Sequence, residues 1–239
     1  MDLCNISVIK ELMSDANISF RKEYGQNFLT DEDTVCRIAE ECCTDSETIL
    51  EIGPGIGSLT KELAERYENV VAIEIDNGLI PVLKYTLGSY PNVKVINEDV
   101  MKCDLASILA PYFEKGGVSV CANLPYYITT PILMMLLESD LPFDYITVMI
   151  QEEVADRLCA DVGGKSCGAI TAVLNYYGSP EKLFTVRSDR FIPEPKVDSA
   201  VVRIKLHKDK PYKPLDEATF FKTVPSSCFL SYSLLCTLP

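Results

Sequence analysis

The sequence is poor in the residues that form clustered metal sites. It has a single histidine, His207, and none of its ten cysteines forms a C-x-x-C pair. Zinc sites normally show such ligands at short, regular spacings. We therefore expect no bound metal, and we expect most cysteines to be reduced and to fill small spaces in the core, as in a cytoplasmic protein.

Long hydrophobic runs are also lacking. The densest apolar stretch, Pro131 to Leu137, is far too short to span a bilayer. The first residues, MDLCNISVIKELMSD, mix acidic and apolar residues at helical spacing and do not resemble a secretion signal. The 239-residue sequence, 47% hydrophobic, therefore predicts a cytoplasmic globular protein with no membrane partner, which we expect to be a monomer.

Basic residues are scarce in the first two thirds of the chain, and the net charge of −13 weighs against a nucleic-acid partner. Residues 1–156 hold 10 basic and 27 acidic residues, whereas residues 157–222 hold 12 and 8. RNA phosphates would be attracted to the later segment. On charge alone, an acidic protein without an RNA partner is an equally good interpretation.

Short apolar runs alternate with amphipathic stretches along most of the chain. Strands are predicted at TILEI (48–52), VVAIEI (70–75), NVKVIN (92–97), GVSVCAN (117–123) and YITVMIQ (145–151). Helices are predicted at SLTKELAERY, GLIPVLKYTLG, TPILMMLLES and EEVADRLCA. This alternation indicates an α/β fold with a parallel sheet covered on both faces, in which ligands bind beyond the carboxyl ends of the strands.

The pattern changes near Gly168. GAITAVLNYYG, EKLFTV and SAVVRIKLH are predicted to be strands that complete the sheet as antiparallel edge strands. The polar stretch KDKPYKPLD is predicted to be a linker, and ATFFKTV to begin a helix.

A glycine-rich loop and two acidic strand ends suggest a nucleotide-like ligand. Gly53, Gly55 and Gly57 follow the first strand, but Ser58 stands where a dinucleotide loop needs its third glycine. Glu74 could bind both hydroxyls of a ribose, and Asp99 the amine of an adenine. A tight structural turn, helix capping by Asp76 and a solvated turn at Asp99 are the alternatives.

The tetrapeptide Asn123-Leu124-Pro125-Tyr126 ends the fourth predicted strand. An aromatic amine is hard to methylate because its lone pair is delocalised into the ring. The Asn123 amide oxygen and a neighbouring backbone carbonyl can accept both N–H hydrogens and aim the lone pair at a methyl donor. Pro125 fixes the turn, and Tyr126 offers a face on which an extruded base can stack. A proline turn with a core tyrosine is the alternative.

Together these motifs resemble the amino-methyltransferases of the seven-stranded, Rossmann-like S-adenosylmethionine-dependent class. The sequence is most similar to the ribosomal small-subunit RNA adenine N6,N6-dimethyltransferases of the KsgA/RsmA type. The resemblance lies in GQNFL (25–29), EIGPG (51–55), NLPYYITTP (123–131), IQEEVADR (150–157) and FIPEPKVDSAVV (191–202). It covers roughly residues 7–215.

The resemblance implies a role for each matching residue. The residues implied for binding S-adenosyl-L-methionine are Asn27, Leu29, Gly53, Gly55, Glu74, Ile75, Asp99, Val100 and Asn123. Those implied for catalysis are Asn123, Leu124, Pro125 and Tyr126, and those implied for the target base are Tyr126 and Phe191. Asn27, Leu29 and Gly53 would contact the methionine part of the cosubstrate. Glu74 would bind its ribose, and Asp99 its adenine amine.

The resemblance also implies a substrate and a domain organisation. Family members dimethylate two adjacent adenosines near the 3′ end of small-subunit rRNA, so the expected partner is this rRNA or the pre-ribosomal small subunit. Residues 1–210 would form the methyltransferase domain, and residues 211–239 a linker and an incomplete helical domain. The family continues with basic residues past position 220, whereas this chain ends in FFKTVPSSCFLSYSLLCTLP. A truncation or reading-frame shift is expected, and a divergent short tail is the alternative.

Two other functions remain open. Large-subunit rRNA adenine methyltransferases of the macrolide-resistance type share the N-terminal motif and the glycine loop. They usually carry isoleucine where Leu124 stands, and they lack a close match to PKVDSAVV. A non-catalytic ribosome-assembly factor on the same fold is the second alternative, although the intact Asn123–Tyr126 tetrapeptide argues against it.

Overall fold

The computed structural model describes residues 1–20, 25–42, 45–161, 164 and 167–208. The strands of its main sheet are β2 (Thr48–Ile52), β3 (Asn69–Glu74), β4 (Val93–Asn97), β5 (Val118–Asn123), β6 (Phe143–Gln151), β7 (Gly178–Val186) and β9 (Ser199–Leu206). Their order is β4-β3-β2-β5-β6-β9-β7. The first five strands in this order run parallel, whereas β9 is antiparallel to both β6 and β7. The prediction of a seven-stranded α/β fold is confirmed, and antiparallel strands complete the sheet, although only β7 lies at its edge because β9 is inserted between β6 and β7.

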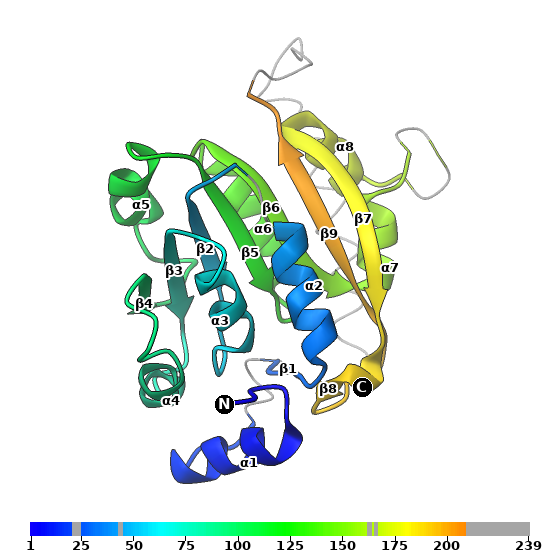
Figure 1. Cartoon of the computed structure of the whole chain (residues 1–239). Coiled ribbons are helices and arrows are strands. Elements are labelled where there is room, and N and C mark those ends of the chain that lie inside the picture. The colour runs from blue at the N-terminus through cyan, green and yellow to red at the C-terminus, as the bar shows by residue number, and fades with distance from the viewer. Residues whose placement is uncertain (21–24, 43–44, 162–163, 165–166, 209–239) are drawn as a thin grey trace.

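Helices cover both faces of the sheet (Figure 1). They are α2 (Glu32–Cys42), α3 (Ser58–Ala64), α4 (Leu79–Thr86), α5 (Leu105–Phe113), α6 (Thr129–Glu138), α7 (Glu152–Leu158) and α8 (Ala169–Tyr177). Successive strand residues point to opposite faces. Accordingly, Leu50 and Val71 pack in the cluster formed with α5 to α8, while Ile49 and Val70 pack with α2 and α3. The central strands are therefore predominantly apolar, as a sheet covered on both faces requires.

A second, smaller sheet lies beyond the carboxyl ends of the parallel strands (Figure 1). It consists of β1 (Phe28–Leu29) and β8 (Phe191–Ile192), which pair antiparallel, with Leu29 opposite Phe191. Helix α1 (Ile6–Asp15) lies beside it and packs Ile9 and Leu12 into a cluster that includes Phe28. The N-terminal segment is thereby fixed next to the edge of the sheet at which ligands bind in this fold.

One predicted element is wrong. GAITAVLNYYG, predicted as a strand, forms helix α8, and β7 begins only at Gly178. The β-branched and aromatic residues suggested a strand, but Ile170 and Leu174, four residues apart, both bury against the core. The Thr171 hydroxyl also accepts the Gly168 N–H at 3.0 Å, which stabilises the first turn of the helix.

Several predictions lie on or beyond the edge of the described residues. Most of KDKPYKPLD, all of ATFFKTV and the whole proposed segment 211–239 lie outside them, so the division into two domains stays a prediction. Within the described part of the chain, no helix is long and apolar enough to cross a membrane. The same residues contain no group of three or more side chains that could hold a metal ion.

Candidate active site

The residues predicted for the site come together at the carboxyl ends of the parallel strands, where they line one pocket. These lining residues are Asn27, Leu29, Gly53, Gly55, Glu74, Ile75, Asp99, Val100, Asn123, Leu124, Pro125, Tyr126 and Phe191. Neighbouring parallel strands end at the same edge of the sheet, so residues that follow β2, β3, β4 and β5 become neighbours. The pocket therefore lies where proteins of this fold bind their ligands.

Glu74 at the end of β3 is held by the glycine-rich loop. Its Oε2 accepts the Gly55 N–H at 3.1 Å, and its Oε1 accepts the Asp76 N–H at 2.8 Å. Burial raises the pKa of Glu74, and the two backbone hydrogen bonds partly oppose this rise. Each carboxyl oxygen has a second lone pair, so Glu74 can still accept hydrogen bonds from a ligand's hydroxyl groups.

Asp76 and Asp99, for which capping and turn roles were the alternative interpretations, both make structural hydrogen bonds. Asp76 accepts the Gly78 N–H at 2.9 Å, close to the capping role considered for it, and also the Gln26 side-chain N–H at 2.9 Å. Asp99 accepts the Met101 N–H at 3.0 Å and pairs with Lys102 at 3.2 Å, as expected for a turn. Because Asp99 also lines the pocket, its turn geometry is compatible with the predicted contact to an adenine amine.

Asn123, the last residue of β5, lines the pocket. Its Nδ2 donates to the backbone carbonyl of Asn27 at 3.3 Å, which fixes the orientation of the amide. Among the described residues, no group donates to its Oδ1. The adjacent Pro125 carbonyl already accepts the Ile128 N–H at 3.1 Å and the Thr129 hydroxyl at 3.2 Å. The amide oxygen of Asn123 is therefore available to accept a hydrogen bond from a ligand, whereas the Pro125 carbonyl is already used.

Two of the predicted aromatic residues, Tyr126 and Phe191, also line the pocket. The Tyr126 hydroxyl and the buried Ser199 hydroxyl, at the start of β9, are hydrogen-bonded at 2.9 Å. Burial raises the pKa of Tyr126, and the bond to Ser199 partly offsets this. Phe191 is buried in β8. Both rings are thus held in place by the late part of the chain.

Residues 25–29, which we call the clamp, lie against the glycine-rich loop and the tetrapeptide Asn123–Tyr126. Gly25 has a φ of +56°, and a Cβ added there would lie 2.9 Å from the Pro125 Cβ. Gly55 has a φ of +61°, and an added Cβ would lie 2.9 Å from the Phe28 ring. Both positions need glycine because of their backbone conformation and because the clamp approaches so closely.

Glu51 is a pocket residue that the sequence analysis did not single out. It lies in β2 with 2% of its surface exposed, and its Oε2 has no hydrogen-bond partner among the described residues. Burial raises the pKa of Glu51 to about 8. An unpartnered buried carboxyl oxygen costs free energy unless a ligand satisfies it. The acid inside the apolar run TILEI was the sequence signal that could have identified Glu51 as a site residue.

Gln26 and Tyr127 also line the pocket, and neither was predicted as a site residue.

Solved structures with the same fold define the class. The dimethyladenosine transferase from Plasmodium falciparum matches with a TM-score of 0.67 at 28% identity, over 76% of this chain and 64% of that one. This chain thus spans slightly less than two thirds of the Plasmodium structure. The 23S rRNA methyltransferase ErmE matches with a TM-score of 0.69 at 29% identity, over 89% and 85%. The fold and the pocket place the chain among the S-adenosylmethionine-dependent methyltransferases.

Sequence relatives define the family. Residues 17–233 match the family model for ribosomal RNA adenine dimethylase. The chain is 45% identical to ribosomal RNA small subunit methyltransferase A of Alkaliphilus oremlandii over 92% of its own length and 77% of that protein. It is 44% identical to the same enzyme of Shouchella clausii over 95% and 77%. The chain belongs to the ribosomal RNA adenine dimethylase family, and the predicted family is confirmed.

Proposed function

We propose that this protein transfers methyl groups from S-adenosyl-L-methionine to the N6 amines of two adjacent adenosines near the 3′ end of small-subunit rRNA. The modification would belong to ribosome biogenesis in the cytoplasm, with the protein acting as a monomer on the pre-ribosomal small subunit. The observation that carries this proposal is Asn123. Its amide lines the pocket and is oriented by a hydrogen bond to the clamp, and among the described residues no group donates to its Oδ1.

The pocket suits S-adenosyl-L-methionine, which supplies an electrophilic methyl group when it is bound. Glu74 would hold its ribose and Asp99 its adenine amine, with Ile75 and Val100 alongside them. Asn27, Leu29, Gly53 and Gly55 would surround its methionine part. Buried Glu51 would become ionised beside a cationic ligand, and its Oε2, which has no partner among the described residues, would then accept a hydrogen bond from the ligand's ammonium group. We propose no metal ion in the reaction.

The residues at the other end would prepare the target amine. Asn123 Oδ1 and the Leu124 carbonyl accept its two hydrogens, which draws the nitrogen lone pair out of conjugation with the ring. Tyr126 and Phe191 hold the extruded base between their rings and exclude water from the reacting nitrogen. Pro125 fixes the loop that carries these groups. No side chain has to remove the proton, because the amine becomes acidic once it is methylated.

Large-subunit rRNA is the second candidate substrate, supported by the structural similarity to ErmE at 29% identity. Two features favour the small subunit. Relatives at 44–45% identity carry the small-subunit name, and Leu124 and the PKVDSAVV segment match the small-subunit pattern.

Tritiated methyl transfer to unmethylated small subunits, followed by mapping of the modified base, tests the proposal. We expect label on adenine N6 near the 3′ end of the small-subunit rRNA. In the parallel reaction with large subunits we expect none. Label confined to large-subunit rRNA would support the second candidate, and cofactor binding without transfer to either substrate would support a non-catalytic role.

A further inference from the structure

The clamp is joined to the residues that cover the base end of the pocket. Strands β1 and β8 pair over two residues each, with Leu29 opposite Phe191. So short a ladder is marginal by itself. It is extended by one further backbone bond, from the Thr30 N–H to the Arg190 carbonyl at 2.8 Å.

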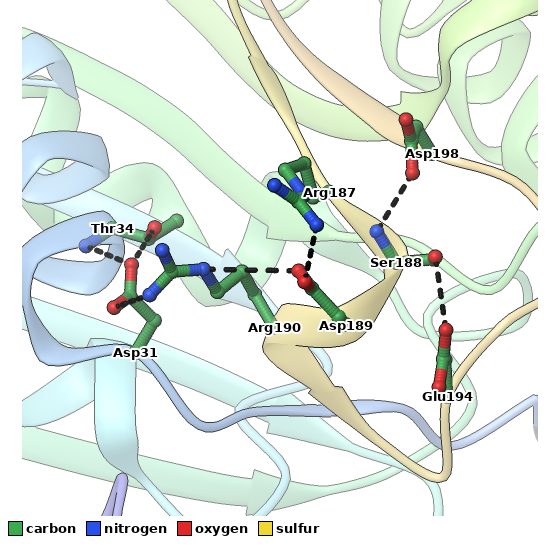
Figure 2. Close-up of polar contacts among 8 residues, drawn as sticks. All are labelled: Asp31, Thr34, Arg187, Ser188, Asp189, Arg190, Glu194 and Asp198. Atoms are coloured by element: carbon green, nitrogen blue, oxygen red, sulfur yellow. Dashed lines mark hydrogen bonds and ion pairs between the residues drawn. The ribbon is translucent and has the colours of Figure 1, made fainter.

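An ion pair strengthens this junction. The Arg190 guanidinium extends to Asp31, with Nη1 2.5 Å from Oδ1 (Figure 2). Asp31 cannot easily turn away, because its Oδ2 accepts the Thr34 N–H at 3.2 Å and the Thr34 hydroxyl as well. The Asp31 side chain is only 18% exposed, which limits the screening of the pair by water. Arg190 is thus anchored to the residue that immediately precedes α2.

The loop that carries Arg190 and Phe191 is also fixed at its other side. The Ser188 N–H donates to Asp198 Oδ1 at 2.8 Å, and the Ser188 hydroxyl donates to Glu194 at 3.2 Å (Figure 2). These bonds close the segment 188–198 on itself. Phe191 is thus held within this closed segment and by its pairing with Leu29.

We propose that the Asp31–Arg190 pair couples the part of the pocket assigned to the methyl donor to the part assigned to the adenine. This coupling rests on the proposed function. Asn27 and Leu29 line the part assigned to the methyl donor, and Phe191 lines the part assigned to the adenine. A cosubstrate that orders the clamp also orders Phe191 through Arg190. By linkage, the base then tightens cosubstrate binding by the same factor. Arg190 is a positioning residue, because it does not line the pocket.

The absence of tryptophan from the sequence permits a direct test. In Phe191→Trp protein, the new indole is the sole tryptophan reporter at the base end. The protein is titrated with S-adenosylhomocysteine, followed by calorimetry and by tryptophan emission. We expect a clear emission change in this parent protein. Adding Arg190→Ala should halve the change in tryptophan emission at saturation. It should also weaken the binding of S-adenosylhomocysteine by about two- to fivefold, the range for a partly exposed ion pair.

Further variants separate the ion pair from general effects on folding. Asp31→Asn keeps a good helix cap and should match Arg190→Ala, with no added effect in the double variant. Arg190→Lys, which keeps the positive charge, should restore part of the change in tryptophan emission. The control is Lys182→Ala, because Lys182 pairs with Glu152 and Asp156 and with no residue of the junction, so both readouts should stay unchanged. Arg187 is unsuitable as a control, because its partner Asp189 also pairs with Arg190 at 3.8 Å (Figure 2).

Hydrogen exchange on protein that retains Phe191 gives a second readout. S-adenosylhomocysteine should protect residues 190–192 in the unmodified protein and protect them markedly less in Arg190→Ala. Equal emission changes and equal protection with and without Arg190 would overturn the coupling while leaving the proposed function intact. If S-adenosylhomocysteine bound to none of these proteins, the proposed function itself would fail, and the coupling with it.

Discussion

At the scale of single residues, the site combines groups that the structure holds rigidly with groups left open. Asn123 and Glu74 each use part of their hydrogen-bonding capacity on the backbone of a neighbouring loop, which orients the remainder toward the pocket. Glu51 has an unused buried oxygen. Unused hydrogen-bonding capacity of this kind is expected where a ligand supplies the missing hydrogen bonds, because a buried polar group without a partner destabilises the ligand-free fold.

Tyr126 should act through its ring, with its hydroxyl serving as a tether. Tyr126→Phe keeps the ring but leaves the Ser199 hydroxyl buried without this partner, at a cost of about 1–3 kcal/mol in unfolding free energy. We expect reduced stability by chemical unfolding and a modest loss of methyl transfer. Tyr126→Ala should remove nearly all transfer at unchanged cofactor affinity. Full activity in Tyr126→Ala would contradict base stacking on this ring.

Glu51 should make the stability of the cofactor-free protein depend on pH. Its pKa is raised from 4.5 to about 8 by burial, so the stability linked to its neutral form is complete below pH 4.5 and lost as the pH rises toward 8. Glu51→Gln should abolish this component, which is on the order of a few kcal/mol. Unfolding by denaturant at several pH values measures it, and an identical pH dependence in both proteins would refute the assignment.

At the scale of helices and strands, local sequence patterns predicted the parallel sheet and its ligand-binding edge. The runs at 48–52 and 117–123 are apolar because both faces are covered, and that signal needs no knowledge of distant contacts. The pairing of β1 with β8 could not be predicted in this way, since two-residue strands have no periodicity and their partners are far apart in sequence. Helix α8 was missed because its β-branched residues resemble those of a strand.

The contact between the clamp and the glycine-rich loop should control cofactor affinity. Gly55→Ala imposes a side chain at a φ of +61° and pushes against the Phe28 ring. We expect about tenfold weaker binding of S-adenosylhomocysteine, corresponding to about 1.4 kcal/mol, by calorimetric titration. Gly168→Ala is the control, because an added Cβ there meets its nearest neighbour only at 3.8 Å. Equal affinity in the two variants would show that the clamp does not close on this loop.

At the scale of the whole molecule, the structure changes the meaning of the charge distribution. Residues 157–222 are basic overall, but several of their cations pair with acids within the described part of the chain. These pairs include Lys182 with Glu152 and Asp156, and Arg203 with Glu41 and Glu181. The positive charge that the sequence suggested for RNA is therefore partly neutralised by the protein itself.

Binding to naked RNA should consequently be weak and only mildly dependent on salt. Each phosphate neutralised by a free cation adds about 0.9 to the slope of log affinity against log salt concentration for a duplex. We expect a slope of about 3 or less in filter binding to a small-subunit 3′ fragment. A slope of about 6 or more would show that this chain offers many more free cations than the described surface suggests.

The most direct test of the account is methyl transfer by Asn123→Ala, compared with Asn175→Ala, whose amide bonds to a carbonyl within α8, away from the pocket. Both proteins should bind S-adenosylhomocysteine with affinities within a few-fold of the unmodified chain. Asn123→Ala should lose about 10²- to 10³-fold in transfer rate to unmethylated small subunits, as when one transition-state hydrogen-bonding group is removed. Asn175→Ala should be unaffected. Unchanged transfer by Asn123→Ala would contradict the assignment of this amide to the target amine.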